Sequence, residues 1–237
     1  MVGVQQRNLN GKESAMVHFY GGIDPSDMPL YSYAAAARTL KLPNSTVRWW
    51  VQGRDQKYEP VLKADSGSLL SFKDLLELYV VKVLRKNRGV TLPAIRRAVA
   101  YAEQLGIRRV LLSENLATYA GNVLLAGLSE TVAISLSGQR LLHELIDGLI
   151  ERIDRDVVGA PVLHPDFVGE QLSGAKLPVS VSPVVAFGAP TISGTGIRTS
   201  MAKARVDSGE KVDEVASDYD VPPALITAAV YFEHAAA

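Results

Sequence analysis

The stretch YSYAAAARTLKLPNSTVRWWVQG, residues 31–53, decides the fold of the front part of the chain. Ser32 is suited to cap a short helix over Tyr33 to Leu40, because serine favours helix N-termini. Pro43 then predicts a turn, since the residue before a proline is pushed out of helical geometry. The stretch therefore begins with a short capped helix and a sharp change of direction.

A second short helix follows the turn. We expect Ser45 to cap it and Gly53 to end it. Thr46, Arg48 and two adjacent tryptophans lie on it. Neighbouring helix positions point about 100° apart, so one tryptophan is expected in the core and the other at the surface. Two short helices and a tight turn are typical of a helix-turn-helix unit, whose second helix enters the major groove of DNA.

The chain beyond Gly53 predicts a wing and two longer helices. Tyr58 to Leu62 and Ser68 to Leu70 flank a loop with turn chemistry, which favours a β-hairpin. Ser71, with Asp74 three residues later, predicts a capped third helix. Thr91 and the following Pro93 predict the start of a fourth. The apolar stripes of these two helices are expected to form the core beneath the recognition helix.

Charge is divided unevenly along the chain. Residues 1–37 carry a net charge of −1, residues 38–109 carry 15 Lys/Arg against 6 Asp/Glu, and residues 110–237 carry 8 against 16. The total of zero thus hides a basic block and an acidic block. The basic block coincides with the helix-turn-helix pattern and indicates a polyanion binder, although basic helices facing water are the alternative. The acidic block favours a protein partner.

Composition bounds the class of protein. The 237 residues suffice for two or three small domains, and the sequence contains no cysteine. A disulfide framework, a thiolate zinc site and a cysteine nucleophile are thereby excluded. No apolar run reaches the length of a membrane span, so we expect a soluble, cytoplasmic protein without a cofactor or metal.

The middle of the chain, residues 107–180, has a mixed α/β pattern. Three short segments are β-prone: residues 109–112, 122–125 and 131–136. Residues 141–153 show a wide apolar helical face, which is either buried in its own domain or pairs with a second subunit. His143-Glu144 begins a zincin-like pattern, but Asp147 stands where the second histidine is required, so zinc binding is disfavoured. Residues 155–180 hold several glycines and prolines and are interpreted as a linker.

The front part resembles the winged-helix DNA-binding domain of the MerR family. The resemblance rests on Arg48-Trp49-Trp50, an Arg-aromatic-aromatic triplet ending the recognition helix, and on the link Gly89-Val90-Thr91-Leu92 between the long helices. The wing departs from the family because it lacks the usual arginine-tyrosine pair, which Lys57 and Tyr58 partly replace. The resemblance, with the chemistry of phosphate and base contacts, assigns DNA binding to seven residues: Asn44, Ser45, Thr46, Arg48, Trp49, Arg54 and Lys57.

The C-terminal part has a second diagnostic stretch, Gly188-Ala189-Pro190-Thr191-Ile192-Ser193-Gly194-Thr195-Gly196-Ile197. Its glycines suggest a phosphate cradle, but no lysine stands at the Walker position, which weakens that interpretation. Three helices are predicted after it: Ser200 to Val206, Val212 to Ser217 and Pro223 to Phe232. Their outline resembles a helix-turn-helix, yet their acidic side chains would repel DNA, so a protein interface is the better interpretation.

This C-terminal stretch resembles a small domain of bacterial antitoxins, with Gly196 in place of the usual arginine. Together with the MerR-like head, it resembles a two-domain VapB-type antitoxin. The resemblance implies a homodimer that represses its own operon and neutralises a PIN-like ribonuclease toxin by direct binding. It places the toxin contacts at Arg198, Thr199, Tyr219 and Phe232, with Arg198 as the residue that covers the toxin's acidic, Mg²⁺-binding site.

The predicted fold is α+β and mainly α. We expect an N-terminal segment (1–30), a MerR-like winged helix (31–106), a mixed middle region (107–180) and a C-terminal trihelical domain (181–237). The alternative function is a transcriptional regulator whose C-terminal half senses a small molecule. An enzyme is disfavoured because the sequence shows no complete triad or metal motif.

Overall fold

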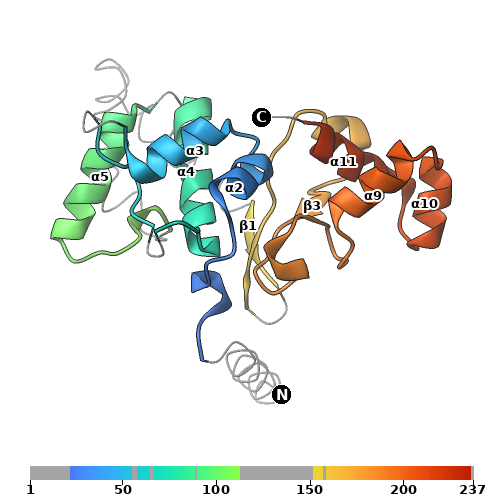
Figure 1. Ribbon diagram of the computed structural model, residues 1–237, viewed down its shortest axis with the longest axis horizontal. Coiled ribbons are helices and arrows are strands. Elements are labelled where there is room, and N and C mark those ends of the chain that lie inside the picture. Colours follow the sequence, from blue (N-terminus) through green and yellow to red (C-terminus); the bar gives the residue numbers. More distant parts are fainter. Residues whose placement is uncertain are drawn as a thin grey trace, which may run out of the picture.

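The computed structural model describes residues 22–54, 58–64, 67–88, 90–112, 152–156 and 159–235. Figure 1 shows two helical bodies, here called the head (residues 31–112, blue to green) and the tail (residues 179–235, orange to red), with the connecting segment (residues 152–178) between them. The predicted mainly helical α+β class is confirmed, because helices dominate and the two small sheets have two antiparallel strands each.

The helices of the head are α2 (Tyr33–Leu40), α3 (Asn44–Gln52), α4 (Phe72–Arg88) and α5 (Leu92–Gln104), with the short 3₁₀ turns η1 (Pro25–Asp27) before them and η2 (Val110–Leu112) after them. The connecting segment holds β1 (Ile153–Arg155), β2 (Pro161–Leu163) and η3 (Glu170–Ser173). The tail holds β3 (Val179–Ser180), η4 (Ala186–Gly188), β4 (Thr191–Ile192), α9 (Thr199–Asp207), α10 (Val212–Asp218) and α11 (Pro223–His234).

The helix-turn-helix forms largely as its caps predict. The Ser32 hydroxyl accepts a hydrogen bond from the Ala35 amide at 3.1 Å, and Gly53 ends α3 with a φ of 79°. The expectation for Ser45 is wrong. Pro43 is the N-cap, its carbonyl accepts the Thr46 amide at 2.9 Å, and Ser45 lies in the first helical turn. The extended ψ of Pro43 starts the helix earlier than expected and leaves the serine hydroxyl free to face outward.

The two longer helices of the head begin where the capping signals place them. At the start of α4 the Ser71 hydroxyl accepts the Asp74 amide at 3.1 Å, and the Asp74 carboxylate accepts the Ser71 amide at 2.8 Å. At the start of α5 the Thr91 hydroxyl accepts the Ala94 amide at 3.4 Å, with Pro93 in the first turn. Their apolar faces bury side chains in one core under α2 and α3.

The predicted wing hairpin is not present in the described part of residues 58–70. Leu70 pairs instead with Tyr31, through backbone hydrogen bonds of 2.7 and 2.9 Å. The amides of Val61 and Leu62 donate to the carbonyl of Trp50 at 2.7 and 3.1 Å. Tyr31, just before α2, and Trp50, near the end of α3, therefore take the backbone hydrogen bonds that a hairpin would use.

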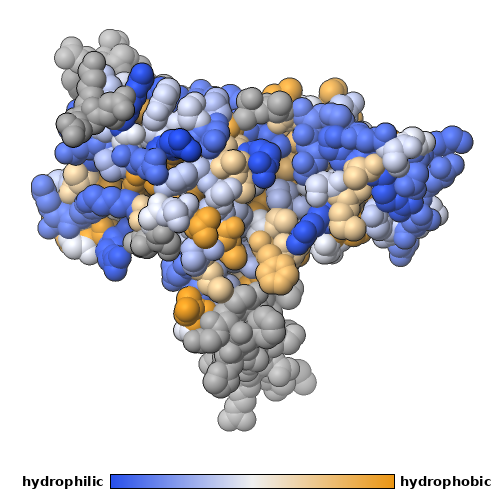
Figure 2. Space-filling view, viewed as in Figure 1, coloured by the Kyte–Doolittle hydropathy of each residue, from blue (hydrophilic) through white to orange (hydrophobic). Residues whose placement is uncertain are grey.

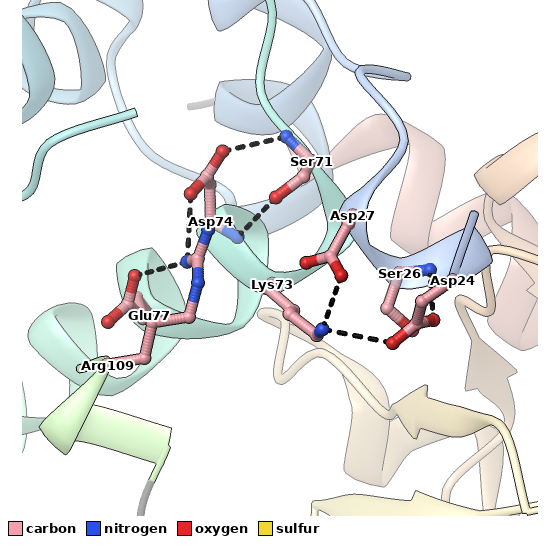
Figure 3. A network of polar contacts seen from close by, with 8 residues as sticks. All are labelled: Asp24, Ser26, Asp27, Ser71, Lys73, Asp74, Glu77 and Arg109. Atoms are coloured by element: carbon pink, nitrogen blue, oxygen red, sulfur yellow. Dashed lines mark hydrogen bonds and ion pairs between the residues drawn. The ribbon is translucent and has the colours of Figure 1, made fainter. Parts of the chain in front are cut away.

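The end of the head is held by a buried ionic contact, and residues 109–112 are not the predicted strand. Arg109 has a φ of 51°, and its guanidinium donates to Asp74 at 2.9 Å and to Glu77 at 2.7 Å, both on α4 (Figure 3). Val110–Leu112 follow as a 3₁₀ turn whose side chains pack onto the same helix. This long-range ion pair outweighs the local β propensity.

A second ionic contact fixes the segment that precedes the head. Lys73 on α4 donates to Asp24 at 3.0 Å and to Asp27 at 2.7 Å, and Asp24 also accepts the Ser26 amide at 2.8 Å (Figure 3). Burial opposes the charged form of Lys73, but its two carboxylate partners raise its pKa. These contacts attach η1 to the head.

The connecting segment is a packed part of the structure. β1 pairs with β2, so that Ile153, expected at the end of a helix, lies in a strand opposite Leu163. Leu163 also forms a two-way backbone pair with Val181 of the tail at 2.8 and 2.9 Å, and both side chains are buried in the core of the head. The rest of that predicted helix, residues 141–151, and the predicted strands at 122–125 and 131–136 lie outside the described residues.

The three predicted helices of the tail are confirmed as α9, α10 and α11. They enclose a small core that includes Ile192, Ala202, Val215 and Ile226, and a second cluster joins Phe167 of the connecting segment to Phe232 of α11. Phe167 and Phe232 meet edge to face, with ring centroids 5.3 Å apart. In the part of the chain that the structure covers, no helix is both long and apolar enough to cross a membrane.

Candidate nucleic-acid interface and acidic tail

Helix α3 presents one polar face outward and one apolar face inward. Asn44, Ser45, Arg48 and Trp49 are exposed, at spacings that place them along one side of the helix. The opposite side buries Val47, Trp50 and Val51 in the core of the head. The expectation for the tryptophans is confirmed, because Trp49 is 43% exposed and Trp50 only 7%. Thr46 is half-buried at the edge of the exposed face.

The chain turns sharply after α3 and brings Arg54 back over the helix. The Arg54 guanidinium carbon lies 4.6 Å from the ring centroid of Trp49, which is cation–π distance. This turn requires Gly53, because a Cβ there would lie 2.5 Å from the carbonyl oxygen of Tyr58. Arg54 and Tyr58 exchange backbone hydrogen bonds of 3.0 and 3.1 Å. Lys57 lies outside the described residues.

A depression of about 290 Å³ lies beside this face and contains two arginines that the sequence did not single out. Arg85 comes from α4 and Arg96 from α5, and both line the depression with Trp49 and Arg54. The Arg96 guanidinium donates to the Glu59 carbonyl at 2.7 Å, which fixes its position. The basic excess of the region was visible in the sequence, but the packing that brings these arginines to α3 was not.

The arrangement suits contact with a nucleic-acid backbone. Arginine forms charge-assisted hydrogen bonds to phosphate, and an exposed indole N–H is a further donor. The side chains of Arg48 and Arg54 project from the second helix of a helix-turn-helix and the residue just beyond it, where base edges and phosphates are within reach in such units. This face therefore has the donors and positive charge that contact with a polyanion requires.

The tail is acidic at its surface. Hydrophilic residues cover α10 and the end of α9 in the space-filling view (Figure 2). Arg205 is held there by two carboxylates, donating from Nε to Glu210 at 2.9 Å and from Nη2 to Asp218 at 2.6 Å, and these hydrogen bonds raise its pKa. Asp213 and Asp220 are exposed and form no ion pair with any residue the structure describes. Such a surface disfavours DNA.

The structure separates the four residues predicted to contact a toxin. Arg198 is exposed and donates to the Ala186 carbonyl at 3.3 Å. Thr199 is fully buried, and its hydroxyl bonds to the Glu233 carboxylate and the Pro190 carbonyl. Phe232 is 1% exposed, and Tyr219 packs half-buried against the tail core beneath Arg205. Of the four, Arg198 is exposed and Tyr219 partly exposed, whereas the side chains of Thr199 and Phe232 are interior.

Three apolar side chains lie together on the surface of the tail and its neighbouring connecting segment. Val168, just before the turn η3, is 80% exposed, and Leu172 on η3 is 74% exposed; η3 packs against α11. Gly169 between them faces the ring of Tyr231, which is itself 38% exposed. Exposed apolar groups that cluster in this way are typical of a protein contact. We call these three residues the η3 patch.

Comparison with known protein families gives one match in the head and another in the tail. Residues 31–102 match the profile of the MerR HTH family regulatory proteins, and residues 179–232 match that of a family described as "Protein of unknown function (DUF433)". The MerR-like head expected from the sequence is thereby confirmed.

Two relatives cover most of the chain. A protein of Mycobacterium tuberculosis (strain ATCC 25618 / H37Rv) named "Putative antitoxin VapB45" is 23% identical over 224 residues, which is 83% of this chain and 90% of that protein. The X-ray crystal structure of Rv2018 from Mycobacterium tuberculosis superposes with a TM-score of 0.60 at 22% identity, over 86% of this chain and 98% of that chain. The latter shows that the two proteins share a fold.

Proposed function

We propose that the chain is a DNA-binding antitoxin, with a head that represses its own operon and a tail that neutralises a PIN-like ribonuclease toxin. The observation that carries the DNA-binding half is the exposed face of α3 with Arg48, Trp49 and Arg54, beside the depression lined by Arg85 and Arg96. The MerR match and the likeness to an antitoxin support the assignment. A homodimer on a two-fold operator follows from the usual geometry of such heads.

Arg48 provides the direct test of DNA binding. Replacing Arg48 with alanine removes one exposed cation from α3, so we expect operator affinity to fall by about 1 to 3 kcal/mol. The slope of log K against log salt should decrease by about one unit, because one fewer counterion is released. Fluorescence anisotropy with a duplex from the promoter region measures both quantities.

Lys211→Ala is the matched control, since it removes one exposed cation from the N-cap of α10, far along the chain from the head. It should leave affinity and salt slope unchanged. If Arg48→Ala and Lys211→Ala bind the duplex equally well, α3 is not the recognition helix.

The toxin-binding half of the proposal places the contact on the η3 patch and the exposed Arg198. An exposed apolar patch suits the desolvated centre of a protein interface, and an exposed arginine suits the acidic site of a Mg²⁺-dependent nuclease. The buried Thr199 and Phe232 would contribute to toxin binding only indirectly, by stabilising the fold of the tail that presents this surface.

Leu172→Asp tests this surface. A carboxylate in the centre of an apolar contact is expected to weaken binding to the toxin more than tenfold, as at an interface hot spot. The measurement is co-purification with, and inhibition of, the PIN-like nuclease that this proposal assigns as the partner. Leu105→Asp is the matched control, because Leu105 is an exposed leucine at the end of α5 in the head. Equal inhibition by both variants removes the η3 patch from the interface.

A further inference from the structure

A second cavity lies where the head meets the tail, away from the exposed face of α3. Its volume is about 300 Å³, at the lower end of the range for small-molecule sites. Residues from α2 and its C-terminal end line one side, and residues from η4, the start of α9 and the end of α11 line the other. Any occupant would therefore touch both bodies at once.

Three cations, two from the head and one from the tail, converge on this cavity. Arg38 comes from α2, Lys41 follows it, and Arg198 immediately precedes α9. None of the three forms an ion pair with a residue that the structure describes. Glu233 is the one carboxylate among the lining residues, and it already accepts a hydrogen bond from Thr199. The lining thus has an excess of positive charge.

Lys41 is held at the cavity wall in an unusual setting. Its ammonium lies 3.6 Å from the ring centroid of Phe232, and its backbone is left-handed with a φ of 55°. Burial lowers the pKa of Lys41 to about 8; Glu233 opposes that shift, while the positive charges of Lys82 and Arg38 add to it. An anion in the cavity would offset the positive neighbours and favour the protonated amine.

A buried hydroxyl without a partner also belongs to the lining. Tyr31 is 4% exposed, and its hydroxyl has no hydrogen-bond partner among the residues that the structure describes. It lies directly against Gly188, where a Cβ would come within 2.3 Å of the phenolic oxygen. Buried polar groups in proteins are nearly always paired, so an unpaired donor on a cavity wall indicates a missing acceptor.

We propose that this cavity binds a small organic anion, whose carboxylate or phosphate group lies among Arg38, Lys41 and Arg198 and accepts a hydrogen bond from Tyr31. The start of α9 adds the partial positive charge of a nine-residue helix, with Ser200 of its first turn in the lining. The cavity size limits the ligand to a small metabolite and excludes a nucleic-acid backbone. Binding would join α2 of the head to the start of α9 in the tail, and it would engage Arg198, the arginine that the proposed toxin contact also uses.

The test is calorimetric titration of the full chain with orthophosphate, 3-phosphoglycerate and succinate at low ionic strength, with glycerol as the uncharged control. We expect at least one of the anions to bind saturably at one site per chain, and glycerol not to bind. Affinity should fall as the pH rises through about 8, since Lys41 then loses its charge. Absence of saturable binding by all three anions would overturn the proposal.

Variants separate a built site from diffuse attraction. Arg38→Gln and Tyr31→Phe should each weaken anion binding about tenfold, the effect of losing one hydrogen bond to a charged group. Lys211→Gln removes the same charge as Arg38→Gln but lies at the N-cap of α10, and should have no effect. Equal weakening by Arg38→Gln and Lys211→Gln would mean that net charge alone attracts the anion. Because Arg38 is at the surface, its variant remains informative if Tyr31→Phe does not fold.

Discussion

Replacing Phe232 with alanine is expected to lower the free energy of unfolding by about 3 to 5 kcal/mol, the range for deleting a buried aromatic ring. Its side chain is 1% exposed. The ring packs edge to face on Phe167, with ring centroids 5.3 Å apart, and the Lys41 ammonium lies 3.6 Å from the ring centroid. Its loss removes contacts with the connecting segment and the head together. Urea denaturation followed by circular dichroism measures the change.

Phe187→Ala is the control for that experiment, because Phe187 is a phenylalanine of the same tail but is 76% exposed. Its free energy of unfolding should change by no more than about 0.5 kcal/mol. If both variants are equally stable, Phe232 is not part of the core. If Phe232→Ala alone fails to bind a toxin, the loss reflects the shape of the tail and does not identify a direct contact.

Replacing Asp166 with alanine is expected to destabilise the protein by about 2 to 3 kcal/mol. Lys82 of α4 is 3% exposed and donates to the Asp166 carboxylate at 2.8 Å, so the variant leaves a buried ammonium without its ion pair. Fully buried pairs cost about 3 to 5 kcal/mol when broken, and the 37% exposure of Asp166 reduces the effect. Chemical denaturation at pH 7 measures it.

Lys82→Met with Asp166→Ala should recover most of that stability, because it removes the stranded charge and keeps the side-chain volume. Burial lowers the pKa of Lys82 below its ordinary value of 10.5. The unfolded chain therefore binds more protons than the folded one between the lowered pKa and 10.5, and stability rises with pH in that window. The deficit of Asp166→Ala should shrink there as the pH increases. A deficit that is unchanged at high pH would exclude the stranded charge as its cause.

Local signals allowed much of the head and tail to be predicted from the sequence. Ser32, Ser71 and Thr91 cap their helices within three residues, and Gly53 ends α3 because its left-handed φ suits glycine. That one of the adjacent tryptophans is buried and the other exposed follows from helical geometry alone. Each of these predictions depends on residues close in the chain.

Features that depend on distant residues were missed or misassigned. Leu70 pairs with Tyr31 instead of closing a wing, and Arg109 is drawn to Asp74 and Glu77 on α4. Arg85 and Arg96 reach the α3 face only through the packing of α4 and α5. Thr199 and Phe232 were assigned to a toxin surface through the family resemblance, yet both are interior. Thr199 bonds to Pro190 and Glu233 within the tail, and Phe232 packs against Phe167 of the connecting segment.

The place of Leu163 and Val181 in the core of the head determines where the polypeptide can be cut. A fragment ending near residue 112 would keep every helix of the DNA-contacting unit but leave the apolar hollow that those two side chains fill open to water. Such a fragment is prone to self-association. If it failed to bind a DNA duplex, the cause would be its incomplete core, and the result would say nothing about DNA binding by the full chain. A soluble minimal module has to extend past Val181.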